Sequence, residues 1–243
     1  MLLRKGPGRP AIDFAAPLSD SPWRSASLPT EEPRSRAFPN AYLSTDEPPR
    51  RSALRRIACA FAAAGFAYLG AVILVLSVIT TEYSPISQAA SDYAVGPYAP
   101  WIGSGFFFAA SGMVGLAVTL VLSRRPTTQR AGGVLMLTSG VALLFDSFFA
   151  TDVEGAPATF HGAVHGVAGV VFFLVSPLAL LLVGGGFGRR WLACLSSGLL
   201  AAAAFVVADG ALALDAFGLV ERIAVLVIFS STILTAARVY RES

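Results

Sequence analysis

Six long apolar runs constrain this chain more than any other feature of its sequence. They cover residues 57–80, 100–123, 131–150, 158–183, 191–214 and 219–238. Each run reaches the roughly 20 residues that an α-helix needs to cross about 30 Å of hydrocarbon, whereas the strands of a membrane barrel are about half as long and alternate polar with apolar residues. The runs therefore predict an all-α, polytopic membrane protein built as a bundle of six transmembrane helices.

The composition excludes an ordinary soluble domain. The 243 residues are 55% hydrophobic and only 14% charged, with a mean hydropathy of +0.66, whereas a soluble domain is about 25% charged. The two cysteines, Cys59 and Cys194, lie near the ends of separate spans, and we expect buried thiols rather than a disulfide. The first ten residues contain no apolar h-region, so the sequence predicts no cleavable signal peptide there.

The first 52 residues differ from the rest of the chain. They contain 9 of the 15 prolines and no sustained apolar period, so we predict a disordered cytoplasmic tail over 1–52 and a six-helix transmembrane domain over 53–243. Gly8-Arg9-Pro10 resembles a minor-groove DNA hook. Because this match is short and lies near Asp13 and Asp20, it favours a solvated tail over nucleic-acid binding. The alternative for the tail is a strap that becomes ordered on a partner complex.

The arginines predict the orientation of the spans. Apart from Arg222, those that flank the apolar runs lie on one side, which the positive-inside rule assigns to the cytoplasm: Arg50, Arg51, Arg55, Arg56, Arg124, Arg125, Arg130, Arg189, Arg190, Arg238 and Arg241. The opposite side receives mostly acids: Glu82, Asp92, Asp152, Glu154, Asp215 and Glu221. We therefore expect a multi-pass protein of the plasma (inner) membrane, with both termini in the cytoplasm and an acidic outer face.

Ionisable side chains gather near the outer ends of several spans. Asp146 lies about one turn from the end of the third span, and His161 and His165 lie four residues apart at the start of the fourth, on one helical face. The loop between these spans is short. The predicted polar cluster consists of Asp146, Asp152, His161, His165, Asp209, Glu221 and Arg222. Ionisable groups at this depth are costly unless partnered, which makes the cluster the candidate functional site.

Three kinds of chemistry, and one structural role, fit this cluster. Zinc is held by His and carboxylate ligands together, so His161, His165 and Asp146 (or Asp152) form a candidate metal site, although Gly162 stands where a zincin has its Glu. Haem held between the two histidines is excluded because they share one helical face. Acids and histidines also suit a proton or ion path, or a lipid headgroup site. In the structural alternative, Arg222 neutralises Asp146 or Asp209 and the histidines bond neighbouring helices.

Several motifs taken in order resemble the Domain of Unknown Function 998 family of prokaryotic membrane proteins. They are Ser87–Gly96 (SQAASDYAVG), Phe145-Asp146 with Asp152, Thr159-x-His161-Gly162-x-x-His165, and Gly218–Ile223 (GLVERI). The resemblance covers about 57–240 and implies six helices with a shared outer polar cluster, and it implies no established activity. The sequence departs from the pattern at Phe229-Ser230-Ser231, where such proteins often have a Trp.

These features favour a non-enzymatic role: an accessory or binding subunit that packs on a larger membrane complex or on lipid. The tail and the small residues on the helix faces motivate this hypothesis, since small residues let helix backbones approach closely in lipid. Two alternatives remain. One is a metal-dependent membrane hydrolase that uses His161 and His165 with a carboxylate, and the other is a proton- or ion-coupled transporter, which the sequence supports less because no inverted repeat is evident.

Overall fold

The computed structural model of the protein describes residues 49–153, 156–184 and 215–243, and these residues form helices joined by loops. The elements are α1 (Pro49–Ile79), the short 3-10 helix η1 (Ala90–Ala94), α2 (Ala99–Leu122), α3 (Thr127–Phe148), α4 (Phe160–Gly184) and α6 (Phe217–Arg241). Five of them, all but η1, are long and apolar enough to cross a membrane. Five of the six predicted spans are thus confirmed as helices, and the predicted span 191–214 lies outside the described residues.

Two helix boundaries follow from proline. α1 begins at Pro49, eight residues before the predicted apolar span and inside the stretch assigned to the tail. Proline is favoured at the first helical position, where its missing N–H is not needed, and arginine is a good helix former, so the helix continues through the basic residues before the apolar run. Pro126 separates α2 from α3 with an extended backbone (φ −51°, ψ 148°), as expected of a residue that cannot continue a helix. The rest of the predicted tail lies outside the described residues.

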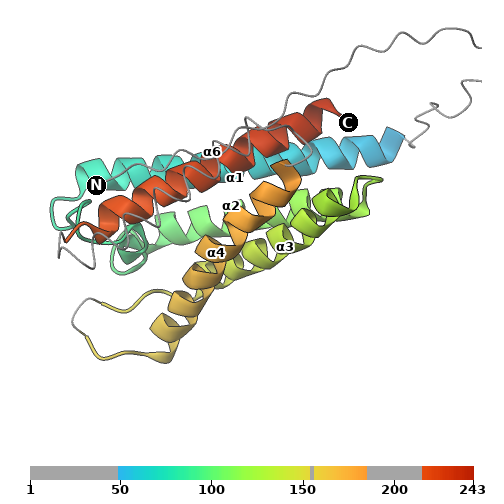
Figure 1. The fold of residues 1–243 in the computed structure, drawn as a ribbon. Coiled ribbons are helices and arrows are strands. Elements are labelled where there is room, and N and C mark those ends of the chain that lie inside the picture. Colours follow the sequence, from blue (N-terminus) through green and yellow to red (C-terminus); the bar gives the residue numbers. More distant parts are fainter. Residues whose placement is uncertain (1–48, 154–155, 185–214) are drawn as a thin grey trace, which may run out of the picture. The chain divides into compact units, whose positions relative to one another are not determined.

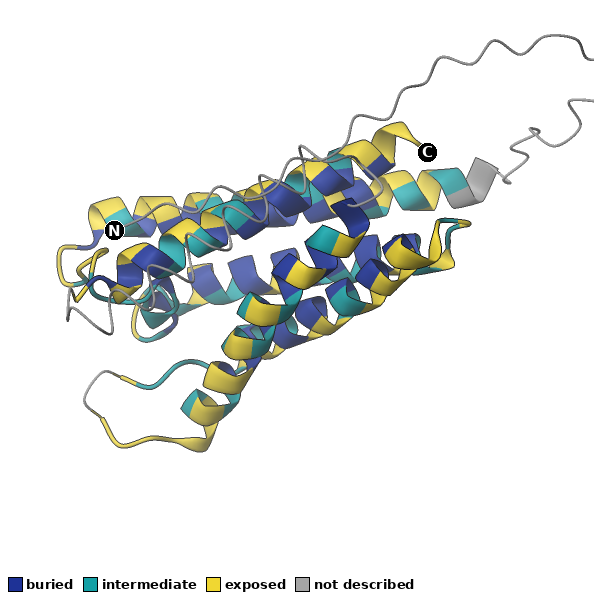
Figure 2. Ribbon diagram, viewed as in Figure 1, coloured by how far each residue is buried: buried dark blue, intermediate teal, exposed yellow. Residues whose placement is uncertain are grey.

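Successive helices pack as neighbours with short connections. α2 packs against both α1 and α3, α4 packs against α3, and α1 also packs against α6, an arrangement that can be followed in Figure 1. Buried residues line the faces that the helices turn toward one another, and exposed residues lie on the opposite faces (Figure 2). Many of the exposed side chains are large and apolar, among them Leu74, Val78, Phe160, Val167 and Leu226. Exposed apolar faces on helices of this length are those of a protein solvated by lipid.

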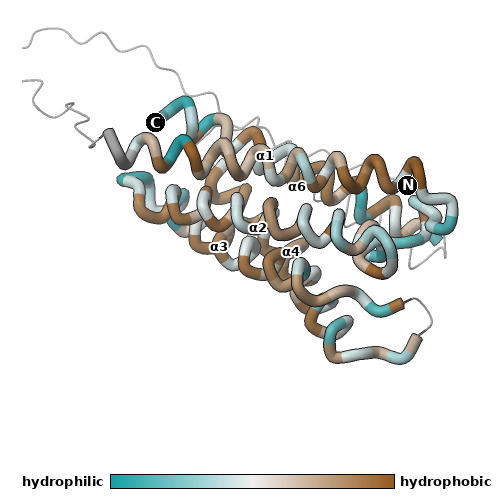
Figure 3. The backbone as a smooth tube through the Cα atoms, turned by 180° about the vertical axis from the view of Figure 1, so that it is seen from behind, coloured by the Kyte–Doolittle hydropathy of each residue, from teal (hydrophilic) through white to brown (hydrophobic). Residues whose placement is uncertain are grey.

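The polar residues gather at the two ends of the helices. Figure 3 shows apolar residues along the helices, with hydrophilic residues mostly in the connections and in the last turn of α6. The end that carries Ile79, Ala99, Phe148, Phe160 and Phe217 is called the acidic end below, and the end that carries Leu122, Thr127, Gly184 and Arg241 is called the arginine end. The predicted cluster residues that the structure describes all lie at or near the acidic end.

Candidate functional site

Asp146 and His165 face each other across the α3–α4 interface. Asp146 lies in the last turn of α3 and His165 in the second turn of α4, and their side chains are both buried. His165 Nδ1 lies 2.9 Å from the carbonyl oxygen of Phe149 and 3.4 Å from Asp146 Oδ1. Because a carbonyl only accepts, Nδ1 carries the hydrogen and donates it to Phe149. Asp146 Oδ1 has no hydrogen-bond partner within the described part of the chain. The structure thus brings together two of the residues that the sequence analysis placed in the polar cluster.

Asp152 forms hydrogen bonds with Thr159 within the connection between α3 and α4. Its Oδ2 accepts a hydrogen bond from the backbone N–H of Thr159 at 3.0 Å, and its Oδ1 accepts one from the Thr159 hydroxyl at 2.6 Å. The Thr159 hydroxyl oxygen in turn accepts the N–H of Gly162 at 3.1 Å, which makes Thr159 the N-cap of α4. A Cβ on Gly162 would lie 2.1 Å from the Asp152 carboxyl carbon. The glycine that separates this sequence from a zincin motif is thus the residue that makes room for Asp152.

The two histidines occupy different environments although they lie one turn apart. His161 is exposed, and its ring packs against Phe149 with 5.2 Å between the ring centroids. His165 is buried, and its ring lies 6.5 Å from that of Phe106 on α2. Among the residues that the structure describes, no group of three or more His, Cys, Asp and Glu side chains is placed to hold a metal ion. Zinc binding by His161, His165 and Asp146 therefore stays a prediction without structural support.

We expect the Asp152–Thr159 contact to make stability depend on pH. Hydrogen bonds from the side chain and backbone of Thr159 lower the pKa of Asp152. A carboxyl whose pKa is lower in the folded state stabilises the fold above its unfolded pKa of about 3.9, and this contribution is lost as the pH falls through the folded value. The melting temperature of Asp152→Asn should therefore lie below that of the wild type at about pH 6 and approach it at about pH 3. A gap that stays constant across this range would contradict this role.

Glu221 and Arg222, in the first turns of α6, bind the connection between α1 and α2. Arg222 donates from Nη1 to the carbonyl oxygens of Gln88 at 2.7 Å and Gly218 at 3.0 Å, from Nε to Ser77 Oγ at 3.2 Å, and from Nη2 to Tyr93 Oη at 3.3 Å. Its guanidinium also lies over the Tyr93 ring, 5.7 Å from the centroid. The hydrogen bonds of Arg222 thus join the start of α6 to the end of α1 and to the α1–α2 connection.

The same loop is bound by the backbone at the start of α6. Glu221 Oε2 accepts the N–H of Ala90 in η1. The N–H groups of Gly218 and Leu219 donate to the carbonyls of Ser87 and Ile86 at 3.3 Å and 2.8 Å. These donors belong to the first turn of α6, where the helix supplies no acceptor for them. The carbonyls of residues 86–87 therefore accept the free backbone N–H groups at the amino end of α6. In return, Glu221 and Arg222 form hydrogen bonds with backbone groups of residues 88–90 in the loop.

Sequence reasoning missed most of these partners. It grouped Glu221 and Arg222 with the other ionisable residues and did not assign a role to Ser77, Gln88 or Tyr93. One signal was available: the runs Ser87–Gly96 and Gly218–Ile223 were both among the motifs of the family resemblance, and these two runs contact each other.

Asp209 and Glu154 lie outside the described residues. The described members of the predicted cluster therefore fall into separate contact groups: Asp146 with His165, Asp152 with Thr159, His161 with Phe149, and Glu221-Arg222 with residues 77–93.

An open cleft lies at the acidic end between the two connections. Its volume is about 430 Å³. The described residues that line it include three carboxylates but no basic residue: Glu82, Tyr83, Gln88, Asp92, Val95, Asp152 and Val153. Residues 82–95 belong to the α1–α2 connection, and Asp152 and Val153 belong to the α3–α4 connection. Hydrogen bonds that involve Arg222 and Asp152 hold these two connections in place. The described residues that frame the cleft are therefore held by contacts within the chain.

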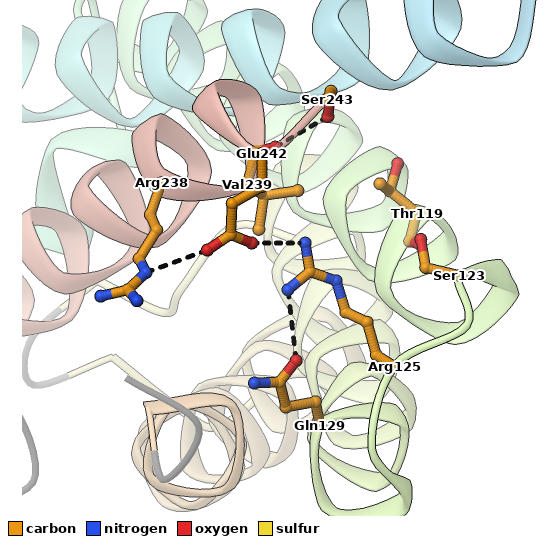
Figure 4. A network of polar contacts seen from close by, with 8 residues as sticks. All are labelled: Thr119, Ser123, Arg125, Gln129, Arg238, Val239, Glu242 and Ser243. Atoms are coloured by element: carbon orange, nitrogen blue, oxygen red, sulfur yellow. Dashed lines mark hydrogen bonds and ion pairs between the residues drawn. The ribbon is translucent and has the colours of Figure 1, made fainter. Parts of the chain in front are cut away.

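A second polar network lies at the arginine end. Glu242, directly after α6, accepts a hydrogen bond from Arg125 Nη2 at 2.8 Å and one from Arg238 Nε at 3.1 Å, and Arg125 also donates to Gln129 at 3.2 Å (Figure 4). Burial alone would raise the pKa of Glu242, but the hydrogen bonds from Arg125 and Arg238 outweigh it, and the pKa is lowered. This carboxylate ties the α2–α3 turn to the end of α6, a structural role that the sequence analysis did not assign.

Comparison with known proteins gives one match. A family model described as "Protein of unknown function (DUF998)" matches residues 57–238, which include all the contact groups described above. No curated protein and no solved structure matches the chain.

Proposed function

Since the chain belongs to the DUF998 family of proteins of unknown function, we propose its function from the geometry: it is a non-enzymatic, multi-pass membrane subunit that binds a cationic group at the acidic end of its helices. The observation that carries this proposal is the cleft of about 430 Å³, whose lining, as far as the structure describes it, holds Glu82, Asp92 and Asp152 and no basic residue. Three carboxylates around one open cleft attract an ammonium or guanidinium group by charge. The sources of such a group are a basic segment of a partner membrane protein and an amine lipid headgroup.

The hydrogen bonds of Arg222 and Asp152 support binding over catalysis. Catalysis by acids and bases needs a convergent set of groups that remain available to a substrate. Arg222 makes four hydrogen bonds within the chain, and Asp152 accepts two from Thr159. Within the described residues these groups hold the two connections that frame the cleft. A preorganised frame reduces the cost of ordering a binding surface, which is what a binding subunit requires.

The orientation of the cleft is part of the same proposal. Because the arginines flank the opposite ends of the helices, the positive-inside rule directs the arginine end to the cytoplasm of a bacterial plasma membrane and the acidic end outward. The cleft would then receive its ligand at the outer surface, and residues 1–52 would be cytoplasmic and available to a partner complex. The metal-dependent hydrolase and the proton- or ion-coupled transporter stay alternatives, and Asp146 and His165 are the residues that a transporter would use.

Binding of a tetra-arginine peptide tests the proposed function. With the protein in detergent, the Glu82→Gln variant should bind the peptide about twofold to fivefold more weakly than the wild type, the range expected for one exposed ion pair. Asp215→Asn is the matched control, since it removes one carboxylate near the same end but outside the cleft lining. Its backbone is in the left-handed region (φ 50°), which Asn tolerates as Asp does. Equal weakening in both variants would mean that net charge alone attracts the peptide, and the proposal would be wrong.

Amine headgroups give the second arm of this test. If the natural cation is a lipid headgroup, vesicles that contain phosphatidylethanolamine should protect the wild type against heat more strongly than they protect the Glu82→Gln variant. The basic segment of a partner is the source if the peptide binds the cleft and these vesicles protect both proteins equally. If neither the peptide nor the vesicles distinguish Glu82→Gln from Asp215→Asn, the cleft does not bind cations.

A further inference from the structure

Three buried side-chain oxygens in the described residues have no hydrogen-bond partner: Ser139 Oγ, Asp146 Oδ1 and Ser176 Oγ. Both serines are completely buried, and Asp146 is 5% exposed. All three lie on two helices, α3 and α4. Buried polar groups are nearly always satisfied, and an unpartnered one points to a bound water, an ion or a functional role. The concentration of three such oxygens on one pair of helices therefore needs a common explanation.

These oxygens lie on the faces that α3 and α4 turn toward each other. Ser139 and Asp146 are seven residues apart, which returns a helix to nearly the same face. That face packs against α4 at Asp146, whose Oδ1 is 3.4 Å from His165 Nδ1. On α4, Ser176 and Val183 are likewise seven residues apart, and Val183 packs directly on α3. The hydroxyls of Ser139 and Ser176 therefore lie within the interface rather than toward lipid.

Pro177, the proline inside α4, follows Ser176 directly. Because proline has no N–H, the carbonyl of Phe173, four residues earlier, lacks its usual helical donor. The two helices run antiparallel, and the contact of Asp146 with His165 sets their register. This register places Ser139 opposite the turn of α4 that contains Phe173 and Ser176. In membrane proteins such a break is compensated by hydroxyl side chains and ordered water.

The interface is closed on the side of the arginine end. A Cβ on Gly132 of α3 would lie 2.7 Å from Val183 Cγ2 and 2.9 Å from the carbonyl oxygen of Ala179. Backbones that approach so closely leave no room for water between them. At the acidic end, α3 ends at Phe148, two residues after Asp146, and continues into the loop that contains Phe149 and Asp152. The acidic end is therefore the side from which water would have to reach the buried oxygens.

We propose that α3 and α4 enclose a hydrated, proton-binding pocket that opens only to the acidic end. Water bonds the hydroxyls of Ser139 and Ser176, and Asp146 exchanges a proton with the acidic side through this water and His165. Since Nδ1 of His165 donates to Phe149, Nε2 is the nitrogen that takes up a proton. The ligands are water and an exchangeable proton, and the pocket is distinct from the carboxylate-lined cleft and does not depend on its function.

Among the residues that the structure describes, few other charged side chains act on Asp146 and His165. His165 faces Asp146 from α4, and Glu221 on α6 acts on Asp146 through space. α2, the other helix that packs on α3, has no ionisable side chain, and it presents Phe106 to His165. An inorganic cation is less suited, since the described residues offer no set of three ligating groups.

Infrared spectroscopy of the protein in lipid nanodiscs tests the proposal. The spectra of the wild type should contain a protonated-carboxyl C=O band that shifts in D₂O and titrates with pH. This band should be lost in Asp146→Asn and kept in Asp152→Asn, the exposed-carboxylate control. In a Ser139→Ala/Ser176→Ala variant the band should move to higher frequency, because the water that bonds the carboxyl is lost. Thr232→Ala should leave it unchanged, since that buried hydroxyl donates within α6 to the Ile228 carbonyl at 2.8 Å.

Two results would overturn the proton-binding pocket. One is a spectrum of Asp146→Asn that retains every exchanging and titrating carboxyl band of the wild type. The other is a double-serine variant whose carboxyl bands match those of the wild type and of Thr232→Ala. If Asp146→Asn does not fold, the double-serine comparison decides alone, because small apolar residues are well tolerated at helix interfaces in lipid.

Discussion

Arg222→Ala is expected to destabilise the protein by about 3 kcal/mol, the range for removing one member of a partly buried charged network. The guanidinium makes hydrogen bonds to Ser77, Gln88, Gly218 and Tyr93, and the substitution removes all of them at once. It also leaves the Gln88 carbonyl without its donor and Glu221 without the neighbouring positive charge. Thermal unfolding in detergent, followed by far-UV circular dichroism, measures the effect.

Arg238→Ala is the matched control for this prediction. Arg238 lies on the same helix, its side chain is about half exposed, and it pairs with Glu242 over one turn. Exposed pairs of this kind contribute about 0.3–0.5 kcal/mol, so its melting temperature should stay close to that of the wild type. Arg222→Lys should fall between the two, because a lysine replaces the charge but not the planar set of donors. Equal melting temperatures for Arg222→Ala and Arg238→Ala would show that the loop is held by other contacts.

Gly112→Ala is expected to have the second large effect, through the packing of α1 on α2. A Cβ on Gly112 would lie 2.5 Å from Ala62 Cα and 2.9 Å from Ala62 N. These are backbone atoms, so no side chain can rotate away and the two helices must separate. Overpacking of this kind costs about 1–3 kcal/mol, and in lipid it also removes the close contact that drives helices to associate. The melting temperature in detergent should fall accordingly.

Gly115→Ala, one turn further along α2, is the control and should act in the opposite direction. Its Cβ would lie 3.4 Å from Ala58 Cβ, close to ordinary van der Waals contact. Replacing glycine by alanine inside a helix is favourable by up to about 1 kcal/mol when there is room. We therefore expect a melting temperature equal to or above that of the wild type. If the two variants shift the melting temperature in the same direction, helix propensity and not the α1–α2 contact controls stability.

The membrane architecture was predictable because each span is a local property of the chain. The apolar runs 100–123 and 158–183 correspond to α2 (Ala99–Leu122) and α4 (Phe160–Gly184) within two residues at every boundary. Bilayer thickness sets the length of such runs independently of how they pack. The proximity of Asp146 and His165 was also predictable, since a short connection makes consecutive helices neighbours.

The grouping of the polar residues was not predictable in the same way. Membrane depth suggested one cluster, whereas Asp152 bonds Thr159 in its own loop and Arg222 bonds a loop far away in the sequence. Depth restricts a side chain along the membrane normal only, and its neighbours within the plane depend on how the helices are arranged around one another. Pro177 and the buried serines were overlooked because a proline or serine within an apolar run gives no periodic signal.

By itself the sequence determined that this is a helical membrane protein, where five of its helices lie, and which end of them is acidic. These properties depend on apolarity and charge summed over short stretches, which the chain carries before it folds. Only the tertiary structure decided that Glu221 and Arg222 bind residues 77–93, that Gly112 lies against Ala62, and that three unpaired oxygens share the α3–α4 interface. Hydrogen bonds and close packing act over a few ångströms, so they depend on helix register and on contacts between segments as much as 145 residues apart.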